Sequence, residues 1–184
     1  MARRSEHPVE ELRRIAIKAG RDELHEKGLR EFSARGAAAR MGYTVGTLYH
    51  LFGDLDQFLL AVNADTLDRW LHDAVNVRPV KFDKRALGFL NSVLVFGREY
   101  KNLWSALTQH VPAEIPDWYR EKCAALPDLL ASYLAVHGYE GTDARRRAAL
   151  LWAGVTGITS LALAGQADKP AKMIEDLYQA VMNA

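Results

Sequence analysis

Residues 33–52 hold two short helical segments joined by a tight turn, and this stretch constrains the fold more than any other part of the chain. Ser33 precedes the first segment and is a good N-cap, because its hydroxyl can accept from the free amides of the first turn. Gly42 ends that segment, since glycine can adopt the left-handed conformation that stops a helix and turns the chain. Thr44 is a second N-cap before residues 45–52, which make about two turns. The pattern predicts a helix-turn-helix.

The remaining chain also has a helical pattern, because strand-like alternation is scarce and Gly and Pro divide it into segments. The first helix is predicted from Val9 to Lys27, between Pro8 and Gly28. Further helices are expected near 54–73, 83–100, 102–110, 117–137, 142–165 and 171–182. Pro127 is expected to kink or split the helix over 117–137. We therefore expect an all-α protein with a three-helix helix-turn-helix domain (1–53) and a C-terminal helical bundle (54–184).

Composition narrows the classes of function. Lys and Arg total 24 against 23 Asp and Glu, so the net charge is +1 and a polybasic protein is excluded. The single cysteine, Cys123, excludes an internal disulfide framework and favours a reducing compartment. With no secretory signal pattern, we expect a cytoplasmic protein. The histidines lack metal-binding spacing and no nucleophile elbow occurs, so no metal, cofactor or enzymatic activity is expected.

One uncharged segment, residues 148–165, approaches the minimum length of a membrane-spanning helix. Three arginines precede it, as they would on a cytoplasmic flank. Its Thr, Ser and Gly residues are instead typical of buried helix interfaces. A membrane span is the minor alternative, and no membrane partner is expected.

The second short helix has a polar outer face. Leu48 and Phe52 are four residues apart and can dock it onto its neighbours. This leaves six residues facing outward, namely Thr44, Val45, Gly46, Thr47, Tyr49 and His50. Hydroxyl groups can bond phosphates, whereas Val and Thr methyls can meet thymine methyls. The pattern favours binding to double-stranded DNA, although a purely structural helix pair joined by glycine would look similar.

The run Phe32-Ser33, Ala37-Ala38 and Met41 to Phe52 resembles the DNA-binding domain of TetR-type transcriptional regulators. In that family a Gly-hydrophobic-Ser/Thr turn precedes a Gly-Thr-Leu-Tyr-His-x-Phe recognition helix. The resemblance implies that Ser33 contacts phosphate and that the six outward residues contact DNA.

Two departures from the family pattern concern charge. Val45 stands where relatives often have Lys or Arg, and Gly53 to Asp56 offers no Lys. Affinity is therefore expected to depend more on four arginines, Arg3, Arg4, Arg35 and Arg40.

The C-terminal half shows a weaker resemblance. Leu151 to Ile158 is similar to the Trp-x-x-x-His-Gly helix of one TetR branch, with Thr156 in place of the histidine. The family implies that the last two helices form a four-helix dimer interface. Because 148–165 is apolar all round, one side can face its own core through Leu150, Leu151, Val155, Ile158 and Leu161. The predicted interface comprises Ala149, Ala153, Gly157, Leu161, Ala164, Leu177, Tyr178 and Val181.

A two-fold homodimer would place its recognition helices about 34–36 Å apart on a palindromic operator. The alternative is a monomeric core with no interface.

Aromatic residues gather after residue 70, and the resemblance implies that the corresponding helices enclose an effector pocket. The predicted lining is Trp70, Phe89, Phe96, Trp104, Trp118, Tyr119, Tyr133, Trp152 and Met173. These side chains favour an apolar or aromatic small molecule. We thus expect a DNA-binding repressor released by such a ligand. The alternative is a helical ligand-binding or enzymatic bundle whose helix-turn-helix does not bind DNA.

Overall fold

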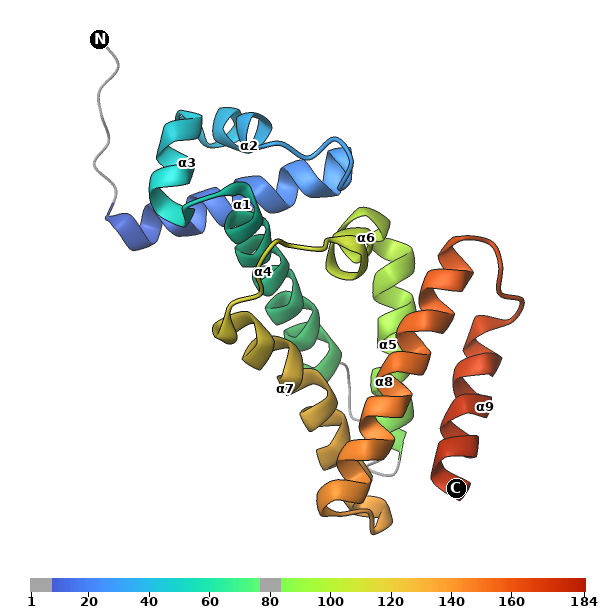
Figure 1. Ribbon diagram of the computed structural model, residues 1–184. Helices are drawn as coiled ribbons and strands as arrows, with labels where there is room; N and C mark the ends of the chain where they lie inside the picture. The colour runs from blue at the N-terminus through green and yellow to red at the C-terminus, as the bar shows by residue number, and fades with distance from the viewer. Residues whose placement is uncertain (1–7, 77–83) are drawn as a thin grey trace. The chain divides into compact units, whose positions relative to one another are not determined.

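The computed structural model describes residues 8–76 and 84–184, and all of its regular elements in these ranges are helices (Figure 1). Arg3 and Arg4 lie outside the described residues. The α-helices are α1 (Val9–Lys27), α2 (Ala34–Met41), α3 (Val45–Phe52), α4 (Leu55–Asn76), α5 (Arg85–Glu99), α6 (Lys101–Gln109), α7 (Asp117–Leu134), α8 (Gly141–Leu163) and α9 (Pro170–Asn183). A 3-10 turn, η2 (Ala135–His137), follows α7. The predicted all-α class is confirmed.

The chain forms two compact units. The first contains the described part of Met1–Asp68 together with Asn102–Glu114, and the second contains Arg69–Lys101 and Ile115–Ala184. The first part of α4 thus packs with the N-terminal helices, whereas its last turns belong to the second unit. The predicted domain boundary after residue 53 differs from this division into compact units. As a division between DNA-binding and ligand-binding domains, it stays a prediction.

The core of the first unit forms where α1 meets α4. Gly20 on α1 permits the close approach, because a Cβ there would lie 2.6 Å from Phe58 Cζ and 2.7 Å from Val62 Cγ2. Phe58 and Val62 are themselves fully buried. Burial of apolar side chains at this density is the main stabilising contribution to such a unit.

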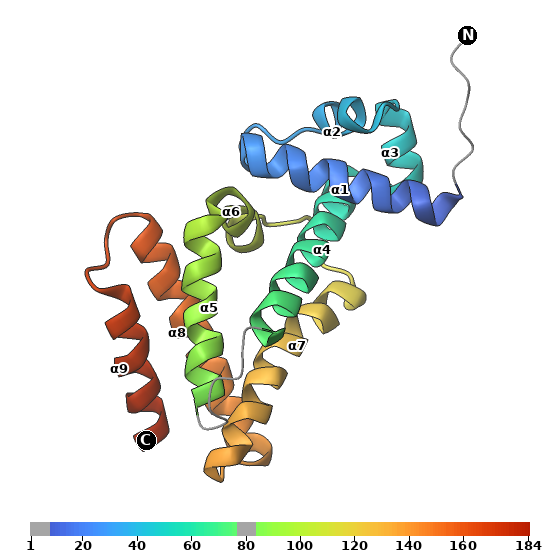
Figure 2. The ribbon, with the colours of Figure 1, turned by 180° about the vertical axis from the view of Figure 1, so that it is seen from behind.

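In the second unit α8 packs against α5, α7 and α9, as the two ribbon views show (Figures 1 and 2). Gly154 lets α9 approach α8, since a Cβ there would lie 2.4 Å from Leu177 Cδ2. The buried Arg147 fastens the end of α9 by donating to the carbonyl of Val181. Its guanidinium also lies 4.2 Å above the centroid of the Tyr139 ring, at a distance typical of a cation–π contact. These contacts fix α9 along α8.

Two expectations about helices are settled by the structure. Pro127 does not split its segment, because α7 continues through it from Asp117 to Leu134. Leu126 and Leu130 on either side of the proline are buried, and their packing holds the helix together despite the lost hydrogen bond. Within the described ranges, no helix is both long enough and apolar enough to cross a membrane, and this holds for α8 as well.

Candidate functional site

The helix-turn-helix forms through the predicted caps. The hydroxyl of Ser33 accepts from the amide of Gly36 at 3.1 Å and starts α2. Gly42 ends α2 in the left-handed conformation, with φ 74°. The hydroxyl of Thr44 then accepts from the amide of Thr47 at 3.3 Å and starts α3. The caps therefore define both ends of the turn, and α3 begins three residues after Gly42.

One side of α3 packs against the rest of the first unit. Leu48 and Phe52 are buried, and the guanidinium of Arg13 lies 4.4 Å from the centroid of the Phe52 ring. Arg13 also donates to the carbonyl of Leu51. The opposite side of α3 consequently faces solvent.

The residues predicted to contact DNA all lie at the surface of this unit. Tyr49 is 44% exposed. The other exposed members are Arg35, Thr44, Gly46 and His50, while Ser33, Val45 and Thr47 are partly buried. The structure therefore brings the predicted set together on α3 and the start of α2. Their contact with DNA stays a prediction.

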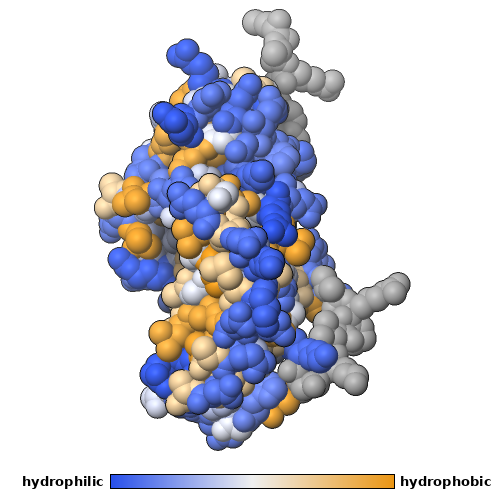
Figure 3. Space-filling view, turned by 90° about the vertical axis from the view of Figure 1, so that its right-hand side faces the viewer, coloured by the Kyte–Doolittle hydropathy of each residue, from blue (hydrophilic) through white to orange (hydrophobic). Residues whose placement is uncertain are grey.

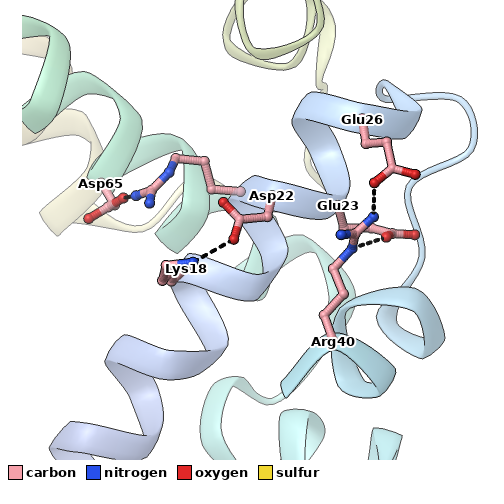
Figure 4. Close-up of polar contacts among 7 residues, drawn as sticks. Lys18, Asp22, Glu23, Glu26, Arg40 and Asp65 are labelled. Atoms are coloured by element: carbon pink, nitrogen blue, oxygen red, sulfur yellow. Dashed lines mark hydrogen bonds and ion pairs between the residues drawn. The ribbon is translucent and has the colours of Figure 1, made fainter. Parts of the chain in front are cut away.

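Arg40, which was expected to add positive charge for DNA binding, is paired with carboxylates of its own unit. Its guanidinium pairs with Glu23 and Glu26 of α1, as Figure 4 shows. These hydrogen bonds raise the pKa of Arg40 and, together with a bond from Lys27, lower the pKa of Glu26. The expectation that Arg40 supports DNA affinity stays a prediction, and this pairing argues against it, because two carboxylates of the fold offset its charge.

A glycine completes this charge cluster. At Gly36 of α2 a Cβ would lie 2.0 Å from Glu23 Oε1, so a larger residue there would displace the buried carboxylate. Sequence reasoning missed this arrangement, because Glu23 and Arg40 are 17 residues apart and no local pattern links them.

The start of α4 carries carboxylates rather than cations. Asp54 caps α4 by accepting from the amide of Gln57 at 2.7 Å. Asp56 accepts from the amide of Ala113 at 2.9 Å and bonds His110 Nε2 at 3.0 Å. The bond from Ala113 first, and that from His110 second, lower the pKa of Asp56. Asp56 thereby ties the segment after α6 to the helix that follows α3, a role that sequence reasoning missed.

Two stretches of the chain match models of one protein family. Residues 16–62 match the family model of the TetR bacterial regulatory proteins, and residues 87–184 match that of the tetracyclin repressor-like C-terminal domain. The chain belongs to the TetR family. Its N-terminal helix-turn-helix is a DNA-binding domain, and its fold is that of a DNA-binding transcriptional regulator.

Solved structures show the same fold at low sequence identity. A TetR transcriptional regulator from Rhodococcus sp. RHA1 is 18% identical, with a TM-score of 0.72 over 95% of this chain and 96% of that one. A TetR-family regulator from Streptomyces coelicolor is 18% identical, with a TM-score of 0.71 over 95% and 80%. RolR in complex with resorcinol is 15% identical, with a TM-score of 0.72 over 95% and 87%. No curated protein matches the sequence.

The TetR-family chain brings together part of the predicted ligand lining. In its second unit the ring of Trp70 lies 5.4 Å from Phe89, 6.0 Å from Phe96 and 6.0 Å from Trp152, centroid to centroid. Tyr133 adds an edge contact with Phe89 at 6.1 Å. We call these five residues the ring cluster. The indole N–H of Trp70 is buried and finds no hydrogen-bond partner in the described ranges.

Other predicted lining residues lie elsewhere. Trp118 is 43% exposed and Met173 is 36% exposed, so neither is enclosed by its own unit. Tyr119 is buried and its ring packs on Trp118 at 5.5 Å. Trp104 belongs to the first compact unit. The exposure of Trp118 and Met173 argues against their place in an enclosed pocket.

The predicted interface of this TetR-family protein lies mostly on an outer stripe of α8. Its exposed members are Ala149, Ala153, Gly157, Leu161 and Ala164, and Leu150 joins them at 49% exposure. We call these six residues the α8 stripe. Figure 3 shows apolar patches on the side of the molecule where α9 and α8 lie. Leu150 was expected to face the core and Leu161 was placed in both sets, because the uncharged stretch 148–165 has no charged residue to indicate which side is exposed.

Three interface residues come from α9, and they differ in exposure. Leu177 and Val181 are partly buried. Tyr178 is buried, and its hydroxyl lies 3.3 Å from His137 Nε2. Tyr178 therefore faces its own unit and has little surface to offer a partner.

Proposed function

We propose that this TetR-family protein is a sequence-specific repressor that binds a palindromic operator as a homodimer and is released by an apolar or aromatic small molecule. The observation that carries the proposal is the solvent-facing side of α3. That side presents Thr44, Gly46, Tyr49 and His50, while Leu48 and Phe52 anchor the helix.

Specific DNA binding is supported by the composition of this surface. A helix fixed on one side can enter the major groove with the other, and its first residues then meet base edges. Arg35 is exposed at the start of α2 and is the natural phosphate contact beside Ser33. The hydroxyls of Ser33 and Thr44 cap their helices, but Tyr49 and His50 are exposed and free to contact a partner such as DNA.

Dimerisation is supported by the α8 stripe. Its small residues permit close helix approach, and apolar side chains exposed at regular spacing along one helix favour a partner surface. A two-fold axis beside α8 makes the interface self-complementary. Such a dimer carries two recognition helices, which is why the operator is expected to be a palindrome.

An effector is supported by the ring cluster. A buried N–H without a partner is costly, typically by about 1–3 kcal/mol, so the indole of Trp70 favours a ligand with a hydrogen-bond acceptor. RolR, which shares the fold, binds resorcinol, an aromatic compound with two hydroxyl groups. Binding would favour a conformation with lower operator affinity.

Selection of bound duplexes from a random DNA pool tests the proposal. Wild-type protein should enrich a palindrome with half-sites about one helical turn apart, and Tyr49→Ala should lose that enrichment without a change in melting temperature. Tyr49→Phe serves as the matched variant, because it keeps the ring and removes only the hydroxyl. An absence of enrichment by the wild type, with a melting temperature that rises on adding small molecules, would instead indicate a ligand-binding helical bundle.

The selected duplex then serves as the probe for the effector. Hydroxylated aromatic and purely apolar compounds are added, and duplex release is measured. Trp70→Phe keeps a ring in the cluster and removes the N–H, so it should weaken the response to acceptor-bearing compounds in particular. If no compound releases the duplex or shifts the melting temperature, the ligand-released repressor is contradicted.

A further inference from the structure

Gly46 has no structural reason to be glycine. Among the residues that the structure describes, a Cβ at this position would meet only the hydroxyl of Thr44, at 3.6 Å, which is an ordinary contact. The residue lies inside α3 and does not have a positive φ. Glycine within a helix is less favourable than alanine, and α3 has only eight residues over which to offset this loss. Packing within the described part of the chain therefore does not require glycine here, which favours a role in contact with a partner.

The residues on either side of Gly46 offer methyl groups. Val45 and Thr47 are both partly exposed. The hydroxyl of Thr47 lies 3.2 Å from that of Thr44, which also accepts from the amide of Thr47. The hydroxyl of Thr47 thus has a partner within the helix, and the methyl is the apolar group that Thr47 offers beside it. We call Val45, Gly46 and Thr47 the first-turn surface: it is shallow and largely apolar.

The side chains that usually read bases through paired hydrogen bonds are missing from this helix. Arg and Lys recognise guanine, Asn and Gln recognise adenine, and Asp and Glu accept from cytosine. Val45–Phe52 contains none of these six residue types. The polar side chains farther along α3, Tyr49 and His50, come after the first-turn surface. The chemistry that the first turn retains is apolar contact.

We propose that the first-turn surface recognises the C5-methyl groups of thymine in the major groove. Gly46 lets the backbone of α3 approach the base edges, and the methyls of Val45 and Thr47 then pack on the thymine methyls. Cytosine, guanine and adenine present no such methyl group in the major groove. The A·T pairs opposite this turn are thus read by shape and apolar contact. The proposal rests on the DNA binding proposed above and specifies its base chemistry.

Uracil scanning of the selected operator tests the proposal with the full-length protein. Each thymine of one half-site is replaced by deoxyuridine, which removes one methyl group and keeps the base pair. At one or two positions the wild-type dissociation constant should rise about threefold to fivefold, the effect expected for one buried methyl group. The proposal is overturned if no deoxyuridine substitution weakens binding. It is also overturned if the selected half-site contains only G·C pairs and so has no thymine for the first-turn surface to contact.

Two protein variants link this effect to the first-turn surface. Val45→Ala and Thr47→Ser each remove methyl groups, and Thr47→Ser keeps the hydroxyl that bonds Thr44. With either variant the loss on uracil substitution should shrink at the position that the residue contacts. Val95→Ala makes the same chemical change as Val45→Ala at an exposed position of α5, and it should leave the uracil effect unchanged. Uracil effects that are identical in Val45→Ala, Thr47→Ser and the wild type overturn the proposal.

Gly46→Ala separates folding from recognition. The added methyl has room in the free protein, so the melting temperature should rise slightly. It should nevertheless weaken operator binding tenfold or more, because it holds the helix away from the base edges. A variant that binds as tightly as the wild type contradicts close approach. An absence of any specific duplex would instead refute the proposed function itself, which the selection experiment shows before any uracil is introduced.

Discussion

Single carboxylates hold distant segments of the first unit together. Glu23 is buried between α1 and α2, where Arg40 neutralises it. Asp56 joins the start of α4 to His110 and Ala113 beyond α6. The two hydrogen bonds to Asp56 favour its ionised form and lower its pKa, so this contact makes the folded state sensitive to acid.

Asp56 allows a test of this pH dependence. Its pKa in the folded protein lies below the ordinary value of 3.8, through the bond from Ala113 and then that from His110. Its contribution to stability is therefore present above the ordinary pKa and is lost as pH falls through the lowered folded pKa. Asp56→Asn should melt at a lower temperature near neutral pH and should lose less stability than the wild type on acidification below about pH 4.

Thermal unfolding at constant ionic strength between about pH 3 and pH 7 measures this difference. Asp117→Asn is the control, because this carboxylate is 89% exposed and bonds only the neighbouring turn of its own helix. Parallel melting curves for wild type and Asp56→Asn across the acid range would contradict the role given to Asp56.

At the scale of elements, local signals in the sequence predict the helices well. Pro8 and Gly28 bound α1 as expected, and Ser33, Gly42 and Thr44 define the two short helices. Features that depend on distant residues could not be predicted. The bond of Arg40 to Glu23 is one such case, and the continuation of α7 through Pro127 is another. In α8 no charged residue within 148–165 indicates which side faces solvent, so Leu150 was placed inward although it is exposed.

Two glycines make a matched prediction about helix packing. Gly20→Ala inserts a methyl group against Phe58 and Val62, both buried, and should destabilise the protein by about 1–3 kcal/mol. Gly46→Ala makes only an ordinary contact with the Thr44 hydroxyl in the described part of the chain and should stabilise the protein by up to about 1 kcal/mol. Urea unfolding of both variants gives the comparison. Equal stability of Gly20→Ala and the wild type would mean that α1 and α4 do not need this close contact.

At the scale of the whole molecule, the proposed function depends on an arrangement that one chain does not complete. A single recognition helix would cover one half-site, and the proposed palindrome would require a second copy. The α8 stripe presents small and apolar residues outward, whereas the other face of α8 is buried against α5, α7 and α9. Dimerisation through α8 therefore leaves the packing of each chain unchanged.

Ala153→Arg tests this arrangement. A charge in the middle of the α8 stripe should halve the mass measured by sedimentation and sharply weaken operator binding, because a monomer contacts one half-site. The chain should still fold, since Ala153 is exposed. Ala124→Arg places the same charge on an exposed position of α7 and should leave both properties intact. A variant Ala153→Arg protein that remains dimeric would place the interface elsewhere.

The pairing of Arg40 with Glu23 and Glu26 also affects how DNA binding responds to ionic strength. Each phosphate neutralised by a protein cation releases condensed counterions, which adds about 0.9 to the slope of log affinity against log salt. An arginine already neutralised within the fold releases none. Each half-site should therefore have a slope about one unit shallower than it would have with a free arginine at this position. Affinity for bulk chromosomal DNA should be lower for the same reason, and contacts with base edges should then account for more of any preference for the proposed operator.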